Sequence, residues 1–381
     1  MLPLNAAVLR LSNTTRNPDE VPDDVEGSMA SWPTNQWYVA AYAEEVTTEG
    51  ILGRTICDEP LALFRTSEGE VVALADRCVH RRYPLSHSHL TEDKVVCGYH
   101  GFTYNNGGQC VAAPAQKHIP RTARVPKYVV VEQDSLVWVW IGEAERADNA
   151  HIPRAPWLDQ EGWTVVRGME RLAARYGLLV DNLLDLSHET YLHGGNIGTP
   201  EVAETPTTTE VDEEAQVVSV SRHMADAGCP PFYARSTGIE GRITRWQDIE
   251  YHPPCLYLLH SRIAPVGLLP PDDGPDNEAF HVEVVYAITP ETEHSTHDFW
   301  MVARDFALED EGVTEYLQQN NRTVVLQDVV ALDLLEKVVE GEKDGYQELS
   351  INIDTGALAA RRLLARQIEA GQAAQTAPSV A

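Results

Sequence analysis

The sequence has no apolar run long enough to cross a bilayer, and its first residues lack the basic start and apolar core of a secretory signal. Basic residues are also few: 29 lysines and arginines stand against 58 acidic residues, for a net charge of −29. Such a charge opposes non-specific binding to nucleic acid and to anionic membranes. We therefore expect a cytoplasmic protein whose partners include neither nucleic acid nor membrane.

Cysteine is scarce, with six residues dispersed through a chain of 381. Without a secretion signal, this pattern argues against a disulfide framework and favours metal or redox use where cysteine has histidine nearby. The sequence also lacks a G-x-G-x-x-G phosphate loop at a β–α turn, so we do not expect it to bind a dinucleotide itself.

What the chain does contain is a series of short strands followed by helices. Alternating apolar runs broken by turns predict an all-β domain to about residue 146. Further strands are expected at 216–224, 243–252, 256–264, 280–290 and 297–306, with helices at about 175–192 and within 309–369. This order predicts an α+β fold. We divide it into a polar arm (1–32), a β domain (33–148), a mixed domain (149–370) and a flexible tail (371–381).

Two motifs in the β domain each pair one cysteine with one histidine. Cys78 and His80 form a C-x-H arm, and after sixteen intervening residues Cys97 and His100 form a C-x-x-H arm. Zinc fingers usually pair like residues on one arm, whereas in a Rieske [2Fe–2S] cluster two cysteines hold one iron and two histidines the other. The mixed arms therefore favour a Rieske cluster, with structural zinc as the alternative.

A second group of metal-binding residue types lies in the run DNLLDLSHETYLH. Asp185 and His188 are three residues apart and would share a helix face, but His193 lies five residues beyond His188. Both histidines can bind one metal only if the helix distorts or ends between them, and the following GGNIG supplies an ending. Two histidines and one carboxylate form the facial triad of non-haem Fe(II) oxygenases. The alternative is a pair of ordinary polar histidines.

Together these motifs resemble the oxygenase component of Rieske non-haem iron aromatic oxygenases, in the vanillate O-demethylase branch. The resemblance covers about residues 33–370. Besides the Rieske arms, it rests on the segments NQWYVAAY, GRTICDEP, DNLLDLSHETYLHGGNIGTPE, CPPFY, RWQDIEYHPP, ITPETEHSTHDFWMVARDF and SINIDTGALAARRLL. It implies a Rieske domain followed by a helix-grip-like catalytic domain, in which C-terminal helices pack on an antiparallel sheet.

The resemblance also implies a ligand set for a mononuclear iron. The family's D-x-x-H-x4-H pattern places His188 and His193 as ligands. The third ligand belongs to a segment resembling E-D-x-x-x-L-E, which here places Asp328, with Asp333 as the fallback. The glutamate that opens this segment in the family is Gln327 in this chain.

Two more residues take roles from the family. Asp185 would accept hydrogen bonds from His188 and from the residue matching His100 in a neighbouring subunit, and so would join the two metal centres. Asn182 would lie beside the iron, although a simple supporting role is equally compatible. The chain departs from the family at its first Rieske arm, where C-P-H-R-G becomes CVHRR and Arg82 replaces glycine.

The implied cofactors are a Rieske [2Fe–2S] cluster and a mononuclear Fe(II). The implied activity is O-demethylation of a methoxylated aromatic acid such as vanillate, with O2, to give a phenol and formaldehyde. A separate reductase with flavin and an iron–sulfur centre, drawing on NAD(P)H, would supply electrons to a homotrimer. Within this chemistry, hydroxylation of an aryl methyl group or ring and N-demethylation are the alternatives.

Two other classes of function stay open: a Rieske electron carrier without oxygenase activity, and a zinc-stapled binding protein. The residues that bind the substrate are only weakly indicated by the sequence. Candidates for meeting a substrate carboxylate are Arg222, Arg245, Arg262 and His260, since guanidinium binds carboxylate in a bidentate manner.

Overall fold

The computed structural model describes residues 9–10, 32–114, 116–342, 346 and 348–376, which form two compact units. One unit contains residues 34–154 together with 289–293, and the other contains the rest. Of the predicted polar arm, only residues 9–10 and 32 are described; Leu9–Arg10 form strand β1 beside β14. Residues 1–8 and 11–31 lie outside the described part.

The smaller unit is all-β, as predicted. Its described strands form three antiparallel sheets in the orders β10-β5-β4-β3, β11-β12-β2 and β6-β7-β8-β9. The strands are β2 (Gln36–Tyr42), β3 (Leu52–Ile56), β4 (Glu59–Arg65), β5 (Val71–Ala75), β6 (His89–Thr91), β7 (Lys94–Val96), β8 (Thr103–Tyr104), β9 (Cys110–Ala112), β10 (Lys127–Tyr128), β11 (Val130–Gln133) and β12 (Leu136–Ile141). The first predicted Rieske arm follows β5, and the second follows β7 of the sheet β6 to β9.

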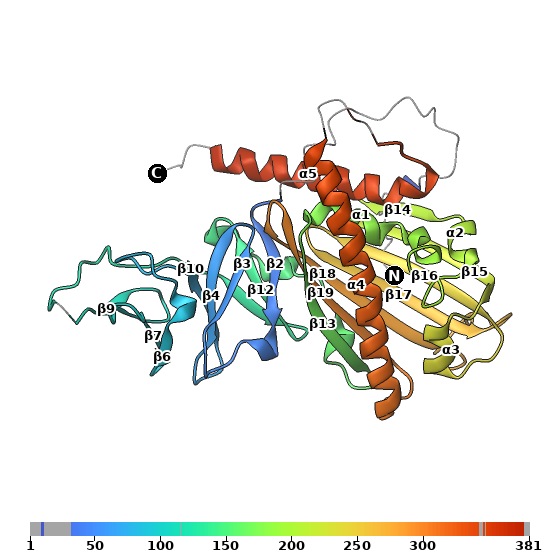
Figure 1. The fold of residues 1–381 in the computed structure, drawn as a ribbon, viewed down its shortest axis with the longest axis horizontal. Coiled ribbons are helices and arrows are strands. Elements are labelled where there is room, and N and C mark those ends of the chain that lie inside the picture. The colour runs from blue at the N-terminus through green and yellow to red at the C-terminus, as the bar shows by residue number, and fades with distance from the viewer. Residues whose placement is uncertain (1–8, 11–31, 115, 343–345, 347, 377–381) are drawn as a thin grey trace, which may run out of the picture. The chain divides into compact units, whose positions relative to one another are not determined.

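The larger unit is built on one antiparallel sheet, in which the described strands follow the order β1-β14-β15-β16-β17-β18-β19-β13. Helices α1, α4 and α5 lie on one face of this sheet (Figure 1). The strands are β13 (Thr164–Leu172), β14 (Thr208–Asp212), β15 (Val217–Gly228), β16 (Arg242–His252), β17 (Leu256–Pro265), β18 (Phe280–Thr292) and β19 (Ser295–Arg304). The helices are α1 (Tyr176–Leu184), α2 (Pro200–Glu204), α3 (Pro231–Thr237), α4 (Glu311–Gly341) and α5 (Thr355–Thr376).

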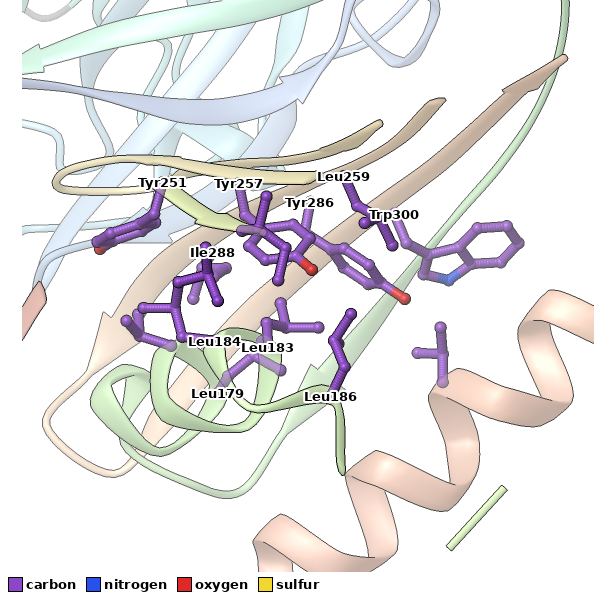
Figure 2. Packing of buried hydrophobic residues seen from close by; sticks show 14 of the residues in the cluster. Leu179, Leu183, Leu184, Leu186, Tyr251, Tyr257, Leu259, Tyr286, Ile288 and Trp300 are labelled. Atoms are coloured by element: carbon purple, nitrogen blue, oxygen red, sulfur yellow. The ribbon is translucent and has the colours of Figure 1, made fainter. Parts of the chain in front are cut away.

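Successive side chains of a strand point to opposite faces, and along β15 and β16 the inner face, which faces the helices, is the more buried one. Figure 2 shows Tyr257, Tyr286 and Ile288 on this inner face, opposite Leu179 and Leu183 of α1. Each such buried side chain contributes about 1.5–3 kcal/mol relative to its exposed state. A register slip of one residue would exchange the two faces, so this burial specifies which polar residues point towards the helices.

The helices differ from the sequence predictions at their ends. A helix was expected over 175–192, but α1 ends at Leu184 because Asp185 adopts an extended conformation and begins a 3₁₀ helix, Leu186–Thr190. The flexible tail was predicted to begin at residue 371, but α5 continues to Thr376, because alanine and glutamine favour helix there. Residues 377–381 lie outside the described part of the chain. Among the described helices, none has both the length and the apolarity to cross a membrane.

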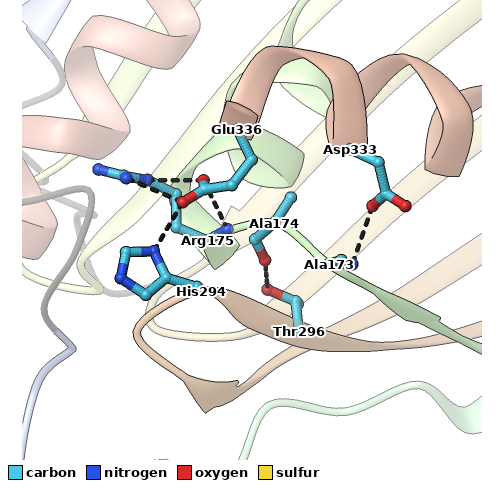
Figure 3. Close-up of polar contacts among 7 residues, drawn as sticks. All are labelled: Ala173, Ala174, Arg175, His294, Thr296, Asp333 and Glu336. Carbon is cyan, nitrogen blue, oxygen red and sulfur yellow. Dashed lines mark hydrogen bonds and ion pairs between the residues drawn. The ribbon is translucent and has the colours of Figure 1, made fainter. Parts of the chain in front are cut away.

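Helix α4 is tied to the junction between β13 and α1 by two carboxylates (Figure 3). Glu336 is buried and accepts hydrogen bonds from Arg175, at 2.8 and 2.9 Å from the guanidinium and 3.1 Å from the amide, and from His294 at 2.8 Å. Asp333 accepts one from the amide of Ala173 at 2.8 Å. These contacts hold α4 in register against the segment that leads into α1.

Candidate metal centres

The two Cys/His arms of the smaller unit form loops of the same shape. The first loop follows β5 and the second follows β7. In each, the amide four residues after the cysteine donates to the cysteine carbonyl: Arg82 to Cys78 and Gly101 to Cys97, both at 2.9 Å. These closing residues have left-handed φ values, 56° at Arg82 and 73° at Gly101. The loop therefore keeps its conformation without the family glycine, at a cost of about 1–2 kcal/mol for a side chain in this region.

In both loops the cysteine side chain is buried and the histidine side chain is exposed. Cys78 and Cys97 are 2% exposed, whereas His80 and His100 are exposed, with ring centroids 4.6 Å apart. Burial raises the pKa of the Cys97 thiol, while backbone amides of the same loop hydrogen-bond its sulfur and oppose the rise. Two buried thiols beside two exposed imidazoles fit the donor set of a Rieske cluster, whose histidine-bearing edge faces solvent.

Tyr104 contacts one of the four candidate cluster ligands, Cys78. Its hydroxyl is 3.1 Å from the sulfur of Cys78 and accepts a hydrogen bond from the amide of Val79. Burial is the first cause that raises the pKa of Tyr104 far above its usual value, so the phenol keeps its proton and can donate to a thiolate. A hydrogen bond to a ligand sulfur favours the reduced cluster, because reduction adds negative charge.

We expect Tyr104→Phe to lower the reduction potential of the cluster by about 20–60 mV, the equivalent of one hydrogen bond lost. Redox titration followed by EPR measures this shift. Tyr128→Phe is the matched control, because that hydroxyl bonds Glu59 and no cysteine. A potential that stays constant in Tyr104→Phe contradicts the assignment of this hydroxyl to the sulfur.

The second candidate centre lies in the larger unit, where three distant segments meet. His188 belongs to the 3₁₀ helix after α1, His193 to the turn that follows, and Asp328 to the middle of α4. One ligand atom from each residue lies within 4.8 Å of the other two. The Nε2 atoms of His188 and His193 are 3.5 and 3.2 Å from the same Asp328 oxygen.

In each histidine ring, the nitrogen farther from Asp328, Nδ1, already makes a hydrogen bond. Nδ1 of His188 lies 2.6 Å from the backbone carbonyl of Asp185, and Nδ1 of His193 lies 2.8 Å from the side-chain oxygen of Gln327. Since both partners accept, each ring carries its proton on Nδ1 and presents an Nε2 lone pair to the centre. Nε2 of His193 is buried with no hydrogen-bond partner in the described chain. Two imidazole lone pairs and a carboxylate on one side fit a facial triad for iron.

The predicted neighbours of this centre are present, with one correction. Asn182 donates a hydrogen bond to the Asp328 oxygen that faces both histidines, at 3.3 Å. Asp185 was expected to hold His188 through its carboxylate, but the contact is made by its backbone carbonyl. Its carboxylate instead accepts from the amide and hydroxyl of Ser187, at 2.9 and 3.0 Å, because Asp185 caps the 3₁₀ helix. The fallback ligand Asp333 is not part of this group and bonds the Ala173 amide.

The sequence shows Gln327 only as a departure from the family's glutamate, whereas in the structure its side-chain oxygen orients His193. Such partners of metal-bound histidines set the tautomer, and their loss typically weakens metal binding about 10- to 100-fold. We expect Gln327→Leu to weaken Fe(II) binding by this factor, as measured by equilibrium competition with a chelator. Gln319→Leu on the exposed side of α4 is the matched control; equal iron affinity in both variants would remove Gln327 from the site.

The basic candidates for substrate binding have different partners. Arg262 pairs with Asp276, and His260 pairs with Glu283, both at 2.5 Å on the outer face of the sheet. Arg245 on the inner face is fully buried and pairs with Glu189 at 3.0 Å. Arg222 is also buried on the inner face, and no ion pair joins it to a carboxylate in the described part of the chain.

Comparison with known proteins places both units in established families. The model of the Rieske [2Fe-2S] domain matches residues 36–128, and the model of the vanillate O-demethylase oxygenase C-terminal domain matches residues 172–370. The chain is 35% identical to a vanillate O-demethylase oxygenase subunit from Pseudomonas sp. (strain HR199 / DSM 7063), over 92% of this chain and 99% of the relative.

Two further similar proteins are named for other compounds, toluene-4-sulfonate and dicamba. The iron-sulfur subunit of a toluene-4-sulfonate monooxygenase system from Comamonas testosteroni is 34% identical, over 88% of this chain and 97% of the relative. The crystal structure of dicamba monooxygenase bound to dicamba superimposes with a TM-score of 0.80 at 31% identity, over 89% of this chain and 98% of the other.

Proposed function

Because the chain belongs to the Rieske non-haem iron oxygenases with a vanillate O-demethylase type of catalytic domain, we propose that it O-demethylates a methoxylated aromatic acid, with vanillate as leading substrate. The observation that carries this proposal is the convergence of His188, His193 and Asp328, with both histidine Nδ1 atoms already engaged. An electron carrier would have no need of this second donor set.

We assign the [2Fe–2S] cluster to Cys78, Cys97, His80 and His100, and the mononuclear iron to the triad. The assignment is supported by the matching loops of the first group and the 4.8 Å grouping of the second. When bound, these groups supply stored electrons and the activation of O2 next to a methyl C–H bond.

The reaction balances with two electrons from outside the chain. The aryl methyl ether, O2, two protons and two electrons give an aryl hemiacetal and water, and the C–O bond of the hemiacetal then breaks to release a phenol and formaldehyde. A separate reductase, containing flavin and an iron–sulfur centre, would deliver these electrons from NAD(P)H. We place the protein in the cytoplasm, where NAD(P)H is available.

The residues around the triad have distinct tasks in this proposal. Asp185 and Gln327 keep the proton on Nδ1 of the two histidines, so that Nε2 stays a ligand atom. Asn182 holds the ligand oxygen of Asp328 in place. The buried leucines and tyrosines between α1 and the sheet exclude water from the reacting methyl group, which limits side reactions (Figure 2).

We further propose a homotrimer with a head-to-tail, ring-closing interface, in which each mononuclear iron is served by the cluster of a neighbouring copy. Asp185 would link the two centres by holding His188 of its own chain through its backbone carbonyl and accepting from His100 of that neighbour through its carboxylate. The partial exposure of Asp185 and the exposure of His100 support this role.

Asp185→Asn separates the charge of this residue from its capping role, since asparagine caps as well as aspartate. We expect both iron centres to remain and electron transfer between them to slow about 10- to 100-fold, as for other partners of metal-bound histidine. Rapid mixing of the reduced protein with O2 and substrate, followed by loss of the Rieske EPR signal, measures the rate. An unchanged rate would exclude the bridging role.

The proposed activity is tested by supplying vanillate and other methoxybenzoates with reductant and O2 and assaying formaldehyde. The relative named for toluene-4-sulfonate favours one second candidate, hydroxylation of an aryl methyl group. Toluene-4-sulfonate and 4-methylbenzoate therefore belong in the same assay, with benzyl alcohols as products. Formaldehyde from methoxybenzoates supports the first proposal; benzyl alcohols without formaldehyde would replace it with the second.

A further inference from the structure

The inner face of the sheet carries a group of buried charges beside the mononuclear centre. Glu189 follows His188 directly in the chain and is 3% exposed. One of its oxygens accepts from Arg245 at 3.0 Å, and the other accepts from the side-chain amide of Gln247 at 2.9 Å. The charges of Glu189 and Arg245 therefore neutralise one another, and Gln247 donates to the other oxygen of Glu189.

Arg222 is a second buried cation in the same group, and it has no such counter-charge. The residue is 3% exposed, and its Nε and Nη1 atoms make long hydrogen bonds of 3.3 Å to the neutral oxygens of Thr205 and Gln247. Its Nη2 atom is buried without any acceptor in the described residues. Burial lowers the pKa of Arg222, and the charges of Glu189 and Asp185, which are not in contact with it, only partly oppose this.

A buried guanidinium without a counter-ion is costly, because it has lost its hydration and gained no anion. Guanidinium matches a carboxylate or sulfonate in a bidentate manner. We propose that Arg222 binds the anionic group of the aromatic substrate and thereby selects acids over neutral aromatic compounds. This inference rests on the proposed function, which it deepens by naming the recognition element.

Tyr257 is a second buried donor on the same inner face. Its hydroxyl is buried without a hydrogen-bond partner in the described chain, and burial raises its pKa well above the ordinary value, so that it stays protonated. It lies on the inner face in register with Tyr286 of β18 (Figure 2). A guanidinium group and a neutral hydroxyl together can donate to more of a carboxylate's lone pairs than either group can alone.

A short chain of contacts connects Arg222 with the triad. Arg222 contacts Gln247, Gln247 contacts Glu189, and Glu189 adjoins the ligand His188. An anion bound at Arg222 would therefore lie on the inner face, linked through Gln247 and Glu189 to the segment that carries His188. Two relatives are named for vanillate and toluene-4-sulfonate, and both compounds are aromatic anions. These names agree with an anion site at Arg222.

The test compares 3-methoxybenzoate with its neutral isostere 3-methoxybenzamide by anaerobic calorimetry on the iron-loaded protein. Wild type should bind the acid more tightly than the amide. Arg222→Gln should lose about 10- to 100-fold in affinity for the acid and little for the amide, since one charged hydrogen-bonding partner is removed. Arg222→Lys should recover part of the preference. Arg242→Met, which removes an exposed arginine, should match wild type.

The proposal is overturned if Arg222→Gln binds the acid as wild type does. It is equally overturned if wild type shows no preference for acid over amide, a result that needs no variant to fold. Binding is measured without turnover, so this outcome is separate from the fate of the proposed reaction. Loss of the acid preference in Arg222→Gln without formaldehyde formation would leave the anion site standing and remove the demethylase assignment.

Discussion

His193→Ala is expected to abolish formaldehyde formation, with a decrease of at least about 1,000-fold in turnover, while the Rieske EPR signal persists. His193 is the most buried of the three triad residues, and its Nε2 has no described partner for a hydrogen bond. Replacing it by alanine removes one of three protein ligands and the contact with Gln327. Iron analysis should show the loss of the mononuclear ion, leaving about two irons per chain.

The control for this variant is His252→Ala, which removes a half-exposed histidine from the outer face of the same sheet. Its iron content and turnover should equal those of wild type. If His193→Ala kept the mononuclear iron and its turnover, the facial triad would be assigned to the wrong residues.

The second large effect is expected at Glu336, which holds α4 against the start of α1 (Figure 3). Glu336→Gln removes the charge that faces Arg175 and His294 and leaves a half-buried arginine without its carboxylate. Breaking a buried pair in this way costs about 3–5 kcal/mol. Urea unfolding should show this loss in free energy, with Glu309→Gln on the exposed loop before α4 as the unaffected control.

The pH dependence of this loss has a defined sign. Burial alone would raise the pKa of Glu336, but hydrogen bonds from Arg175 and His294 lower it from 4.5 to about 2. A carboxyl whose pKa is lowered by folding stabilises the protein above its unfolded pKa and loses this contribution as pH falls towards the folded pKa, in total about 3 kcal/mol. The stability difference between wild type and Glu336→Gln should therefore be constant above pH 5 and shrink below about 4.5. A constant difference down to pH 4 and below would contradict the ion pair.

Apolar patterning was enough to predict most strands of the large sheet. Alternation marks β15 and β16, where buried and more exposed residues take turns. The segment 280–290 lies within β18 and 297–304 within β19; these strands are buried along most of their length, so their apolar, β-branched and aromatic runs predicted them. The break after α1 was less visible. A helix was extended to 192 from its leucine pattern, but Asp185 ends it by capping the next turn, and capping depends on backbone angles that periodicity does not report.

The metal-binding residue types were visible as spacing, whereas their supporting contacts were not. His188 and His193 lie close together in the chain, so a motif can show them; Asp328 lies more than one hundred residues away and was found only through a family resemblance. The hydrogen bond from His193 to Gln327 joins residues 134 positions apart. The missing counter-charge of Arg222 is a property of three-dimensional neighbours, so no local pattern could distinguish it from Arg245 or Arg262.

A single-turnover experiment tests the central claim most directly. The iron-loaded protein is fully reduced, freed of reductant, and exposed to O2 with vanillate. The two-centre assignment predicts that the Rieske EPR signal disappears while formaldehyde forms in amounts approaching the mononuclear iron content. Oxidation of the cluster without formaldehyde from any methoxybenzoate, in protein that retains both iron centres, would contradict it.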